Sequence, residues 1–273
     1  MSQSFETSVA PDMPQVRDWV ARLRLQKGLG PAREALLMLL RRHPDHAGVQ
    51  ELAQWHDLQW WQTLDFGGIR LERRSPEHFD FVWSLVLDRP FSSKLKHIPE
   101  DLTPRDLLQA LTQDQIALLP DSRSIQWVVF KGQQPIGLSM FVNINFRNRS
   151  AEQIMGVLPQ HDHSFLVGDA YCASLLFAFN SLGLNKVQGL IYERNREVAE
   201  QQERLGFKRE GLLRQAVWNE SEQCYEDLLQ ISLLREDFER NRVLQRHISR
   251  QAHAPSLRQQ REWPRFPLAP APG

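Results

Sequence analysis

Apolar positions recur at helical spacing through the first quarter of the chain. In PQVRDWVARLRLQKG, Val16 and Val20 fall on one helical face with the tryptophan between them, and a glycine ends the run. A second amphipathic run, PAREALLMLLRRHPDH, follows at once. The pattern predicts a helical hairpin, which we assign as an appendage at residues 14–66 behind a flexible leader at residues 1–13.

The second helix of this hairpin is similar to the second helix of a tetratricopeptide-type repeat. Small residues and leucines precede a closing His-Pro pair, as such repeats often show. Repeats of this kind need stacked neighbours to bury their faces, and no second copy follows at a fixed period. We therefore interpret the hairpin as an accessory element, with a protein partner for these helices as a hypothesis.

From residue 67 the pattern changes to short strands that alternate with helices. Ser75-Pro76 and Thr103-Pro104 each open a helix, with a hydroxyl residue as cap and proline in the first turn. β-branched and aromatic runs predict strands. These runs are IRLERR, SIQWVVFK, QQPIGLSMFVNINF, AEQIMGVLP, LNKVQGLIYE and the final pair FKREGLLRQAVWNE and QCYEDLLQISLLR.

A helical run lies between the strands AEQIMGVLP and LNKVQGLIYE, which implies one crossover in the middle of an otherwise antiparallel order. The fold class is therefore mixed α/β (α+β), over residues 67–240. The last segment, residues 245–273, is rich in Arg, Gln and Pro and predicts a disordered basic tail.

Charge does not point to a polyanionic partner. Lys and Arg number 33, and Asp and Glu also number 33, so no global field would draw the protein to nucleic acid or to an anionic membrane surface. Small ligands or a protein partner are favoured instead. Composition leaves the oligomeric state open.

Cysteine usage and the N-terminal segment indicate a cytoplasmic protein. The two cysteines lack metal-ligand spacing and fit a reducing compartment. The first residues have neither the basic start nor the apolar centre of a signal peptide. No apolar run approaches the ~18 residues of a membrane span. The motif His161-Asp162-His163 lacks further ligands nearby, so we predict no metal.

One long stretch carries a family resemblance. FNSLGLNKVQGLIYERNREVAEQQERLGFKREGLLRQAV, followed by YEDLLQISLLREDF, resembles the C-terminal half of a GNAT acyltransferase of the RimJ/RimL-like branch. A helix ends near LGL, a strand follows, an asparagine starts the next helix, and LGFKREG precedes the last hairpin. The resemblance covers roughly Ile69 to Phe238 and implies the GNAT fold, with a splayed pair of strands in a mixed central sheet.

This resemblance also implies an acyl-coenzyme A donor, acetyl-CoA or another acyl-CoA, bound where the two strands part. The strands would be Gln153–Leu158 and Lys186–Glu193. Their backbone can pair with an extended ligand as if it were an added strand. The donor-contacting residues implied here are Met155, Gly156 and Val157, by main chain, and Asn195.

The loop that should receive the donor's diphosphate departs from the family. Aligned back from FNSLGL, the two family glycines fall on Phe165 and Val167, where a side chain costs about 1 kcal/mol or more in a crowded or left-handed backbone. Asp162 adds a negative charge near an anion site. Gly168 offers one close approach, and Asp169 is expected as a helix cap or first-turn acid. The loop residues assigned to the donor are His163, Leu166, Val167, Gly168 and Asp169.

The catalytic positions are partly altered. Many family members carry a proton-donating tyrosine three residues before LGF, and that position is Gln202. Its amide can hydrogen-bond a thiolate or a thioester oxygen but cannot act as a general acid. Glu152, in NRSAEQIMGV, matches the place of a base that takes a proton from the attacking amine. A strand-edge glutamate paired with Arg147 or Arg149 is the alternative.

These residues favour an N-acyltransferase that acetylates an amine. The acceptor would be a small-molecule amine, such as an amino sugar, or a protein N-terminus. Two alternatives stay open: a non-catalytic binding or regulatory module that has lost CoA binding, and a transferase that uses a non-CoA donor. The residues expected to form the acceptor pocket are Trp83, Phe91, Trp127, Asn143 and Asn145.

Overall fold

The chain divides into two compact units. The computed structural model describes residues 10–93, 99, 101–161, 165–220 and 222–251. One unit comprises Met1–Gln62 with Gln115–Asp121, and the other comprises Thr63–Asp114 with Ser122–Gly273. Each unit has its own buried side chains and is described separately.

The smaller unit contains three successive helices rather than a hairpin. They are α1 (Met13–Lys27), α2 (Leu29–Arg42) and α3 (Ala47–Trp55), and the short helix α7 (Leu119–Ser122) follows much later in the chain. The third helix forms because Val49, Leu52 and Trp55 repeat every three residues behind the capping side chain of His46. The hairpin prediction was therefore incomplete.

The predicted boundary at residues 66–67 falls inside a β-hairpin. Leu64–Phe66 forms strand β1 and pairs antiparallel with Ile69–Leu71 across the turn at Gly67. The Gly-Gly pair predicted a domain break because glycine favours both linkers and tight turns. Here it makes the turn, so the larger unit begins at Thr63.

A buried histidine makes the smaller unit sensitive to acid. His56 is 3% exposed, and its Nδ1 lies 2.8 Å from the Leu52 carbonyl oxygen. Burial, with a smaller contribution from the nearby charges of Arg24 and Arg17, lowers the pKa of His56 from 6.5 to about 4. The imidazole of His56 therefore takes up a proton at a lower pH in the folded protein than in the unfolded chain.

We expect this histidine to destabilise the fold as the pH falls from 6.5 toward 4. The unfolded state binds the proton first in that window, so stability is complete above it and declines below it, by about 3 kcal/mol at most. Urea unfolding at pH 7 and pH 4.5 measures the decline. The neutral variant His56→Gln should show a smaller difference between the two pH values, and an equal difference would contradict the assignment.

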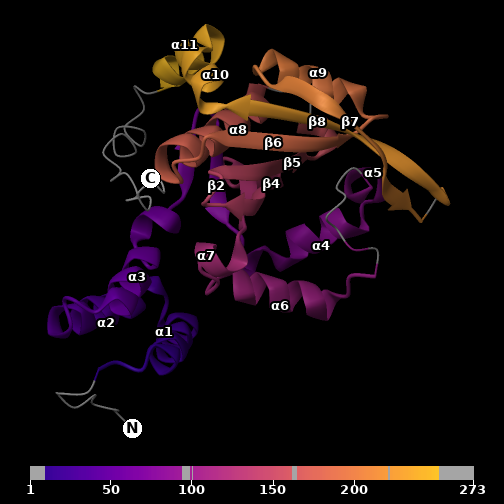
Figure 1. The fold of residues 1–273 in the computed structure, drawn as a ribbon. Helices are drawn as coiled ribbons and strands as arrows, with labels where there is room; N and C mark the ends of the chain where they lie inside the picture. Colours follow the sequence, from indigo (N-terminus) through magenta and orange to yellow (C-terminus); the bar gives the residue numbers. More distant parts are fainter. Residues whose placement is uncertain (1–9, 94–98, 100, 162–164, 221, 252–273) are drawn as a thin grey trace. The chain divides into compact units, whose positions relative to one another are not determined.

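One mixed sheet of eight strands forms the centre of the larger unit (Figure 1). The strand order is β1-β2-β3-β4-β5-β6-β8-β7, and every neighbouring pair is antiparallel except β5 and β6. The strands are β1 (Leu64–Phe66), β2 (Ile69–Arg73), β3 (Ile125–Lys131), β4 (Gln134–Asn145), β5 (Ser150–Val157), β6 (Lys186–Tyr192), β7 (Lys208–Asn219) and β8 (Cys224–Leu234). The mixed α/β prediction is confirmed, and the predicted crossover joins the parallel strands β5 and β6.

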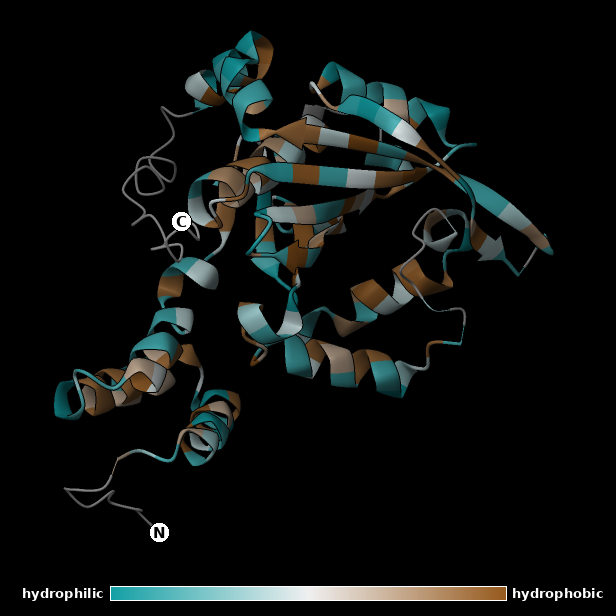
Figure 2. Cartoon of the chain, viewed as in Figure 1, coloured by the Kyte–Doolittle hydropathy of each residue, from teal (hydrophilic) through white to brown (hydrophobic). Residues whose placement is uncertain are grey.

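Helices cover both faces of this sheet. The helices are α4 (Phe79–Leu87), α5 (Arg89–Ser92), α6 (Pro104–Asp114), α8 (Phe165–Leu176), α9 (Arg196–Arg204), α10 (Arg235–Arg240) and α11 (Arg242–Gln251). Leucines of α4 and α6 pack on one face against Val128, Leu138 and Met140. Figure 2 shows hydrophobic residues concentrated on the central strands, between these helical layers.

Strands β5 and β6 pair only at their beginnings. The parallel ladder joins Ser150 to Lys186 and ends at Glu152 opposite Gln188, although both strands continue. The predicted splay of the two strands is therefore present, and its open part begins at Gln153 on one side and Gly189 on the other. Beyond this point the facing backbone groups are not joined across the gap.

The segment after β8 is helical further than predicted. Residues 245–251 belong to α11, whereas the sequence favoured a disordered tail from residue 245. Leu244 of this helix is buried, and His247 Nε2 lies 2.6 Å from a carboxylate oxygen of Asp169. The buried Leu244 and the contact between His247 and Asp169 help to hold this helix, whose many arginines had favoured a solvated tail in the sequence analysis. Residues 252–273 lie outside the described part of the chain.

Candidate functional site

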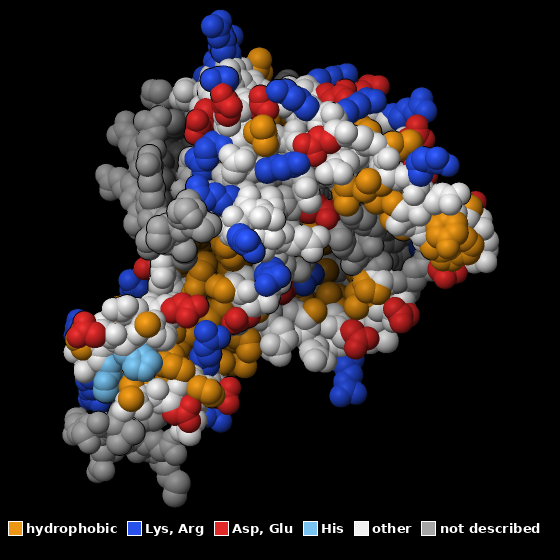
Figure 3. Space-filling model, in the orientation of Figure 1, with side chains coloured by type: hydrophobic (Ala, Val, Ile, Leu, Met, Phe, Trp, Pro, Cys, Tyr) orange, Lys and Arg blue, Asp and Glu red, His pale blue; other side chains and the backbone are white. Residues whose placement is uncertain are grey.

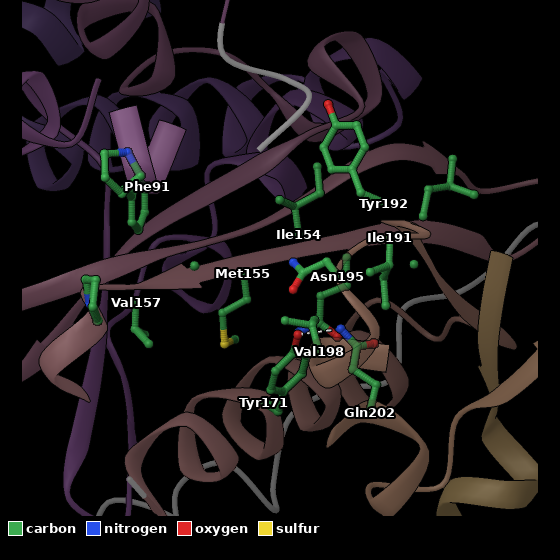
Figure 4. Close-up of a pocket in the computed structure, with 16 residues that line it drawn as sticks. Phe91, Ile154, Met155, Val157, Tyr171, Ile191, Tyr192, Asn195, Val198 and Gln202 are labelled. Carbon is green, nitrogen blue, oxygen red and sulfur yellow. Dashed lines mark hydrogen bonds between the residues drawn. The ribbon is translucent and has the colours of Figure 1, made fainter. Parts of the chain in front are cut away.

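A cleft of about 90 Å³ opens where β5 and β6 part (Figure 4). Both strands, α5, α8 and α9 contribute to its walls. The residues that line it are Pro90, Phe91, Gln153, Ile154, Met155, Gly156, Val157, Pro159, Tyr171, Gly189, Leu190, Ile191, Tyr192, Asn195, Val198 and Gln202. The donor-strand residues that the sequence singled out therefore lie in one cleft, together with Phe91, Asn195 and Gln202.

The described residues that line this cleft carry no formal charge. Among its residues only Tyr171 and Tyr192 have titratable side chains; the rest are apolar, amide or glycine. Such a surface suits a neutral, extended ligand, because an isolated ion in these surroundings would lose hydration without a partner. Any charge that develops during a reaction here must be met by amides, phenols or backbone groups.

The register of the sheet decides which way the β5 side chains point. Opposite residues on neighbouring strands share a face, and Met155 lies opposite Ser139. The Ser139 hydroxyl is 3.0 Å from that of Ser174 on α8, so this is the α8 face. Ile154, one residue earlier, packs against the cluster of α4 and α6 on the other face. By the same alternation, Gln153 faces α8 and Glu152 faces α4.

Gln153 presents an unsatisfied amide at the point where the strands part. The residue is 5% exposed, and neither its amide oxygen nor its amide nitrogen has a hydrogen-bond partner within the described structure. A buried amide without partners costs about 1–3 kcal/mol. A ligand with its own amide groups would satisfy it, so the lining fits an extended amide-bearing molecule.

Two amide side chains of α9 border the cleft. Asn195 caps α9, but its side chain accepts no hydrogen bond from the helix. Gln202 is 6% exposed and donates from Nε2 to the Tyr171 hydroxyl oxygen at 2.6 Å. Figure 4 shows this contact as a dashed line beneath the two strands. The residue predicted to replace the family's tyrosine is therefore joined to another tyrosine.

Glu152, the predicted base, is buried beside the cleft but does not line it. Its exposure is 2%, and the Asn143 side-chain amide donates to its Oε2 at 3.3 Å. The carboxylate belongs to the α4 face, so it is separated from the phenol and amide groups on the α8 face by the strand itself.

The acceptor pocket predicted from sequence is not assembled as one site. Trp127 is a core residue, 1% exposed, with edge-to-face contacts to Phe141 and Phe177. Trp83 stacks on Phe79 and lines no described cavity. Asn143 and Asn145 border a separate hollow beside residues 122–124. From sequence, one pocket could have held all of these residues. In the structure, α4 carries Trp83, and the sheet turns Trp127 away from Asn143 and Asn145.

The first turn of α8 replaces the expected diphosphate loop. Helix α8 begins at Phe165, so Leu166, Val167 and Gly168 are helical and do not line the cleft. Asp169 was expected as a helix cap or first-turn acid, and this was wrong, because it is the fifth residue of α8. Its buried carboxylate accepts from the Gly68 amide at 3.1 Å and contacts His247, because β1–β2 and α11 pack against this turn. His163 lies outside the described residues.

Three polar residues of the lining were missed by the sequence analysis. Tyr171 looked like one more apolar-face residue of a core helix, and Gln153 like an ordinary strand residue. Tyr192 ends β6, where the Arg194 guanidinium lies 4.8 Å from its ring centroid. Burial, and then the Glu226 carboxylate, raise the pKa of Tyr192. The available signal was polar residues on strands and a helix that were otherwise expected to be buried.

No group of three or more His, Cys, Asp or Glu side chains among the described residues is placed to hold a metal ion. Within the same residues no helix is long and apolar enough to cross a membrane.

Comparison with known families decides the identity of this domain. A family model described as "Acetyltransferase (GNAT) domain" matches residues 69–208. The chain belongs to this family. The match begins at β2 and ends where β7 starts, so it includes both splayed strands, α8 and α9 of the GNAT domain.

Individual relatives of this GNAT domain are distant. "Uncharacterized N-acetyltransferase YoaA" of Bacillus subtilis (strain 168) is 23% identical over 111 residues, which are 40% of this chain and 63% of that protein. The chain therefore spans less than two thirds of the length of this curated relative.

Solved structures share the fold. The spermidine N-acetyltransferase of Vibrio cholerae in complex with CoA and spermine has a TM-score of 0.57 at 21% identity, over 63% of this chain and 98% of that one. A dodecameric structure of spermidine N-acetyltransferase from the same organism has a TM-score of 0.54 at 21% identity, over 64% and 98% of the two chains. At these identities the likeness concerns the GNAT fold alone.

Proposed function

We propose that this protein is an N-acetyltransferase that moves an acetyl group from acetyl-CoA to an amine. The observation that carries the proposal is the cleft between β5 and β6, whose facing backbone groups are unpaired beyond Glu152 and Gln188. An extended ligand can pair with such a strand edge through main-chain hydrogen bonds alone. When bound there, acetyl-CoA would supply the thioester that the amine attacks.

The residues that would hold the donor are those of the open edge. Main-chain groups of Met155, Gly156 and Val157 would pair with its pantetheine arm, and the unpartnered amide of Gln153 would gain a partner. Asn195, uncommitted to its own helix, would add a side-chain contact. Because most of these contacts use backbone, the departures from the family pattern around residue 165 leave this part of the site intact.

The proton from the attacking amine requires an acceptor. We assign this role to Glu152, acting through water, because its carboxylate is one residue from the cleft wall and shielded from solvent. Gln202 offers amide hydrogens to the cleft side of α9. The motif LGFKREG and the helix-starting Asn195 favour the RimJ/RimL-like branch of the family.

The acceptor is an amine of low molecular weight or a protein N-terminus. One relative of this fold is named for spermidine and holds spermine, which supports small polyamines beside the amino sugars and peptide amines considered from sequence. The uncharged cleft accommodates the neutral amine that attacks, whereas a protonated amine would lack a counter-charge on the lining.

A second function is a binding module without catalysis. It is favoured by the first turn of α8, where Phe165 and Val167 stand at the positions of the two family glycines, and by the commitment of Asp169 to other partners. These features remove the usual diphosphate contacts while leaving the fold. Without those contacts the donor would bind weakly or not at all.

Calorimetric titration with acetyl-CoA separates the two functions. We expect a dissociation constant in the micromolar range or below, because the open strand edge offers several main-chain hydrogen bonds to an extended ligand. Mass spectrometry of reactions with spermidine, glucosamine and a peptide bearing a free N-terminus then identifies the acceptor. A flat titration together with no acetylated product would favour the binding module.

A further inference from the structure

Few of the described side chains that line the cleft can give a proton. Among the described residues, its lining contains no carboxyl, imidazole, thiol, ammonium or guanidinium group, and two phenols are the titratable side chains there. Attack of an amine on a thioester expels a thiolate, which must take up a proton to leave as a thiol. If the protein rather than solvent supplies this proton from the lining, the donor is Tyr171 or Tyr192.

Tyr192 is the weaker of these two candidates. It ends β6 on the face that carries α4, and Figure 4 shows its ring pointing away from Tyr171 and Gln202. Its ring lies beneath the Arg194 guanidinium. Burial and the Glu226 carboxylate raise the pKa of Tyr192, which makes it a poorer acid.

Tyr171 occupies the side of the cleft where β5 and β6 separate. It lies on α8, is 6% exposed, and its hydroxyl oxygen accepts a hydrogen bond from Gln202. The backbone of Gly189, the first β6 residue beyond the ladder, lies close to the same glutamine: a Cβ added there would be 3.5 Å from its Oε1. The hydroxyl is therefore held at the start of the splay.

The hydrogen bond between these side chains has a defined direction. The Gln202 amide donates to the phenol oxygen, so the phenol's own hydrogen points elsewhere. A donor on the phenol oxygen also stabilises the phenolate that remains after proton transfer. Gln202 thus does two things for Tyr171: it fixes the ring hydroxyl in the cleft, and it supports the charge left behind.

We propose that Tyr171 is the catalytic proton donor to the departing thiolate and that Gln202 is its positioning residue. This inference rests on the proposed acetyl transfer. The amine nitrogen bonds to the acyl carbon and loses a proton to the base. The carbon–sulfur bond breaks with its electron pair on sulfur, sulfur takes the Tyr171 hydroxyl proton, and the phenolate regains a proton from solvent.

The contact between side chains of α8 and α9 explains why the phenol can come from α8 although the family's tyrosine position is on α9. Helices α8 and α9 both border the cleft, and their side chains meet at the contact between Tyr171 and Gln202. A hydroxyl can therefore reach one place from either helix. In this chain the phenol comes from α8, and the α9 position, where the family resemblance leads one to expect tyrosine, carries the amide that holds it.

The substitution Tyr171→Phe tests the proposal because it removes one oxygen atom and keeps the ring. We expect kcat for acetyl transfer to fall about 10²–10⁴-fold, as for loss of a general acid. The dissociation constant for acetyl-CoA, measured by calorimetry on the same variant, should stay within about threefold of wild type, since the donor contacts are mainly backbone. Unchanged binding also demonstrates that the variant is folded.

Tyr225→Phe is the matched control. The chain has three tyrosines, and Tyr225 lies outside the cleft, 60% exposed beside Trp218 on the β7–β8 hairpin. Figure 3 shows a hydrophobic patch at the end of this hairpin, away from the cleft lining. The same loss of a phenol oxygen should leave kcat and acetyl-CoA binding as in wild type.

The pH dependence of kcat distinguishes proton donation from a structural role. A tyrosine loses its proton near pH 10. Wild-type kcat should therefore fall at alkaline pH, whereas Tyr171→Phe should lack that decline. Tyr192, the other titratable group of the lining, and the Asp169–His247 pair at the start of α8 are present in both proteins. Gln202→Leu should lower kcat about 5–10-fold, the loss of one hydrogen bond.

These measurements distinguish failure of the role of Tyr171 from failure of the proposed acetyl transfer. A wild-type protein that neither binds acetyl-CoA nor acetylates any amine overturns the proposed function, and the role of Tyr171 with it. An active wild type, combined with a Tyr171→Phe variant whose kcat stays within about threefold and whose alkaline decline persists, overturns the role of Tyr171 alone.

Discussion

Replacing Trp127 with alanine is expected to lower the free energy of unfolding by about 3–5 kcal/mol, the range for aromatic-to-alanine changes in a packed core. Trp127 is 1% exposed and lies between Phe141 and Phe177, with ring centroids 6.0 Å and 5.3 Å away. Removal of the indole leaves a cavity and deletes both edge-to-face contacts. Denaturant unfolding of the full chain measures the loss.

Trp218→Ala provides the comparison for this prediction. Trp218 is 41% exposed and contacts Tyr225 at the hairpin end, so its loss should cost no more than about 1.5 kcal/mol. Sequence analysis placed Trp127 in the acceptor pocket instead. If Trp127→Ala kept wild-type stability but raised KM for the amine, the acceptor role would stand and the core role would fail.

Replacing Gly137 with alanine is expected to damage both stability and donor binding. A Cβ there would meet the Gly156 carbonyl oxygen and would lie 2.8 Å from Val157 Cα, both backbone atoms of β5. Backbone cannot give way by a rotamer change, so β5 must shift. We expect a loss of about 1–3 kcal/mol, as for overpacking a core. Acetyl-CoA binding should weaken as well, because Gly156 and Val157 line the cleft.

Gly211→Ala is the control for this substitution. Gly211 also lies in a strand, and no atom lies within 4 Å of the position a Cβ would take. The substitution should change the free energy of unfolding by no more than about 0.5 kcal/mol relative to wild type. The dissociation constant for acetyl-CoA, measured by calorimetry, should not change. Equal effects of the two glycine substitutions would show that lost glycine flexibility, rather than the contact with β5, is responsible.

Patterns in the sequence predicted strands β2 to β8 and the family of the larger unit, whereas β1 and the extent of α11 were missed. Buried side chains recur at every second position of a strand and at every third or fourth position of a helix, so their pattern can be recognised in the sequence. The motif stretch from Phe179 onward predicted the crossover, the splayed strands and the cleft edge at Met155 and Gly156. Local caps did the same for α4 and α6.

Only the tertiary structure decided which side chains meet in the cleft. Trp127 and Phe91 both suited an acceptor pocket as residue types, but the register of β3 turns Trp127 into the core, whereas α5 places Phe91 on the cleft wall. Asp169 looked like a helix cap until β1–β2 and α11 supplied its partners. Tyr171 and Gln202 are 31 residues apart, and their hydrogen bond exists because α8 and α9 border one gap in the sheet. The periodicity of a sequence indicates which side chains are buried, whereas the contacts that a buried side chain makes depend on the packing of elements distant in sequence.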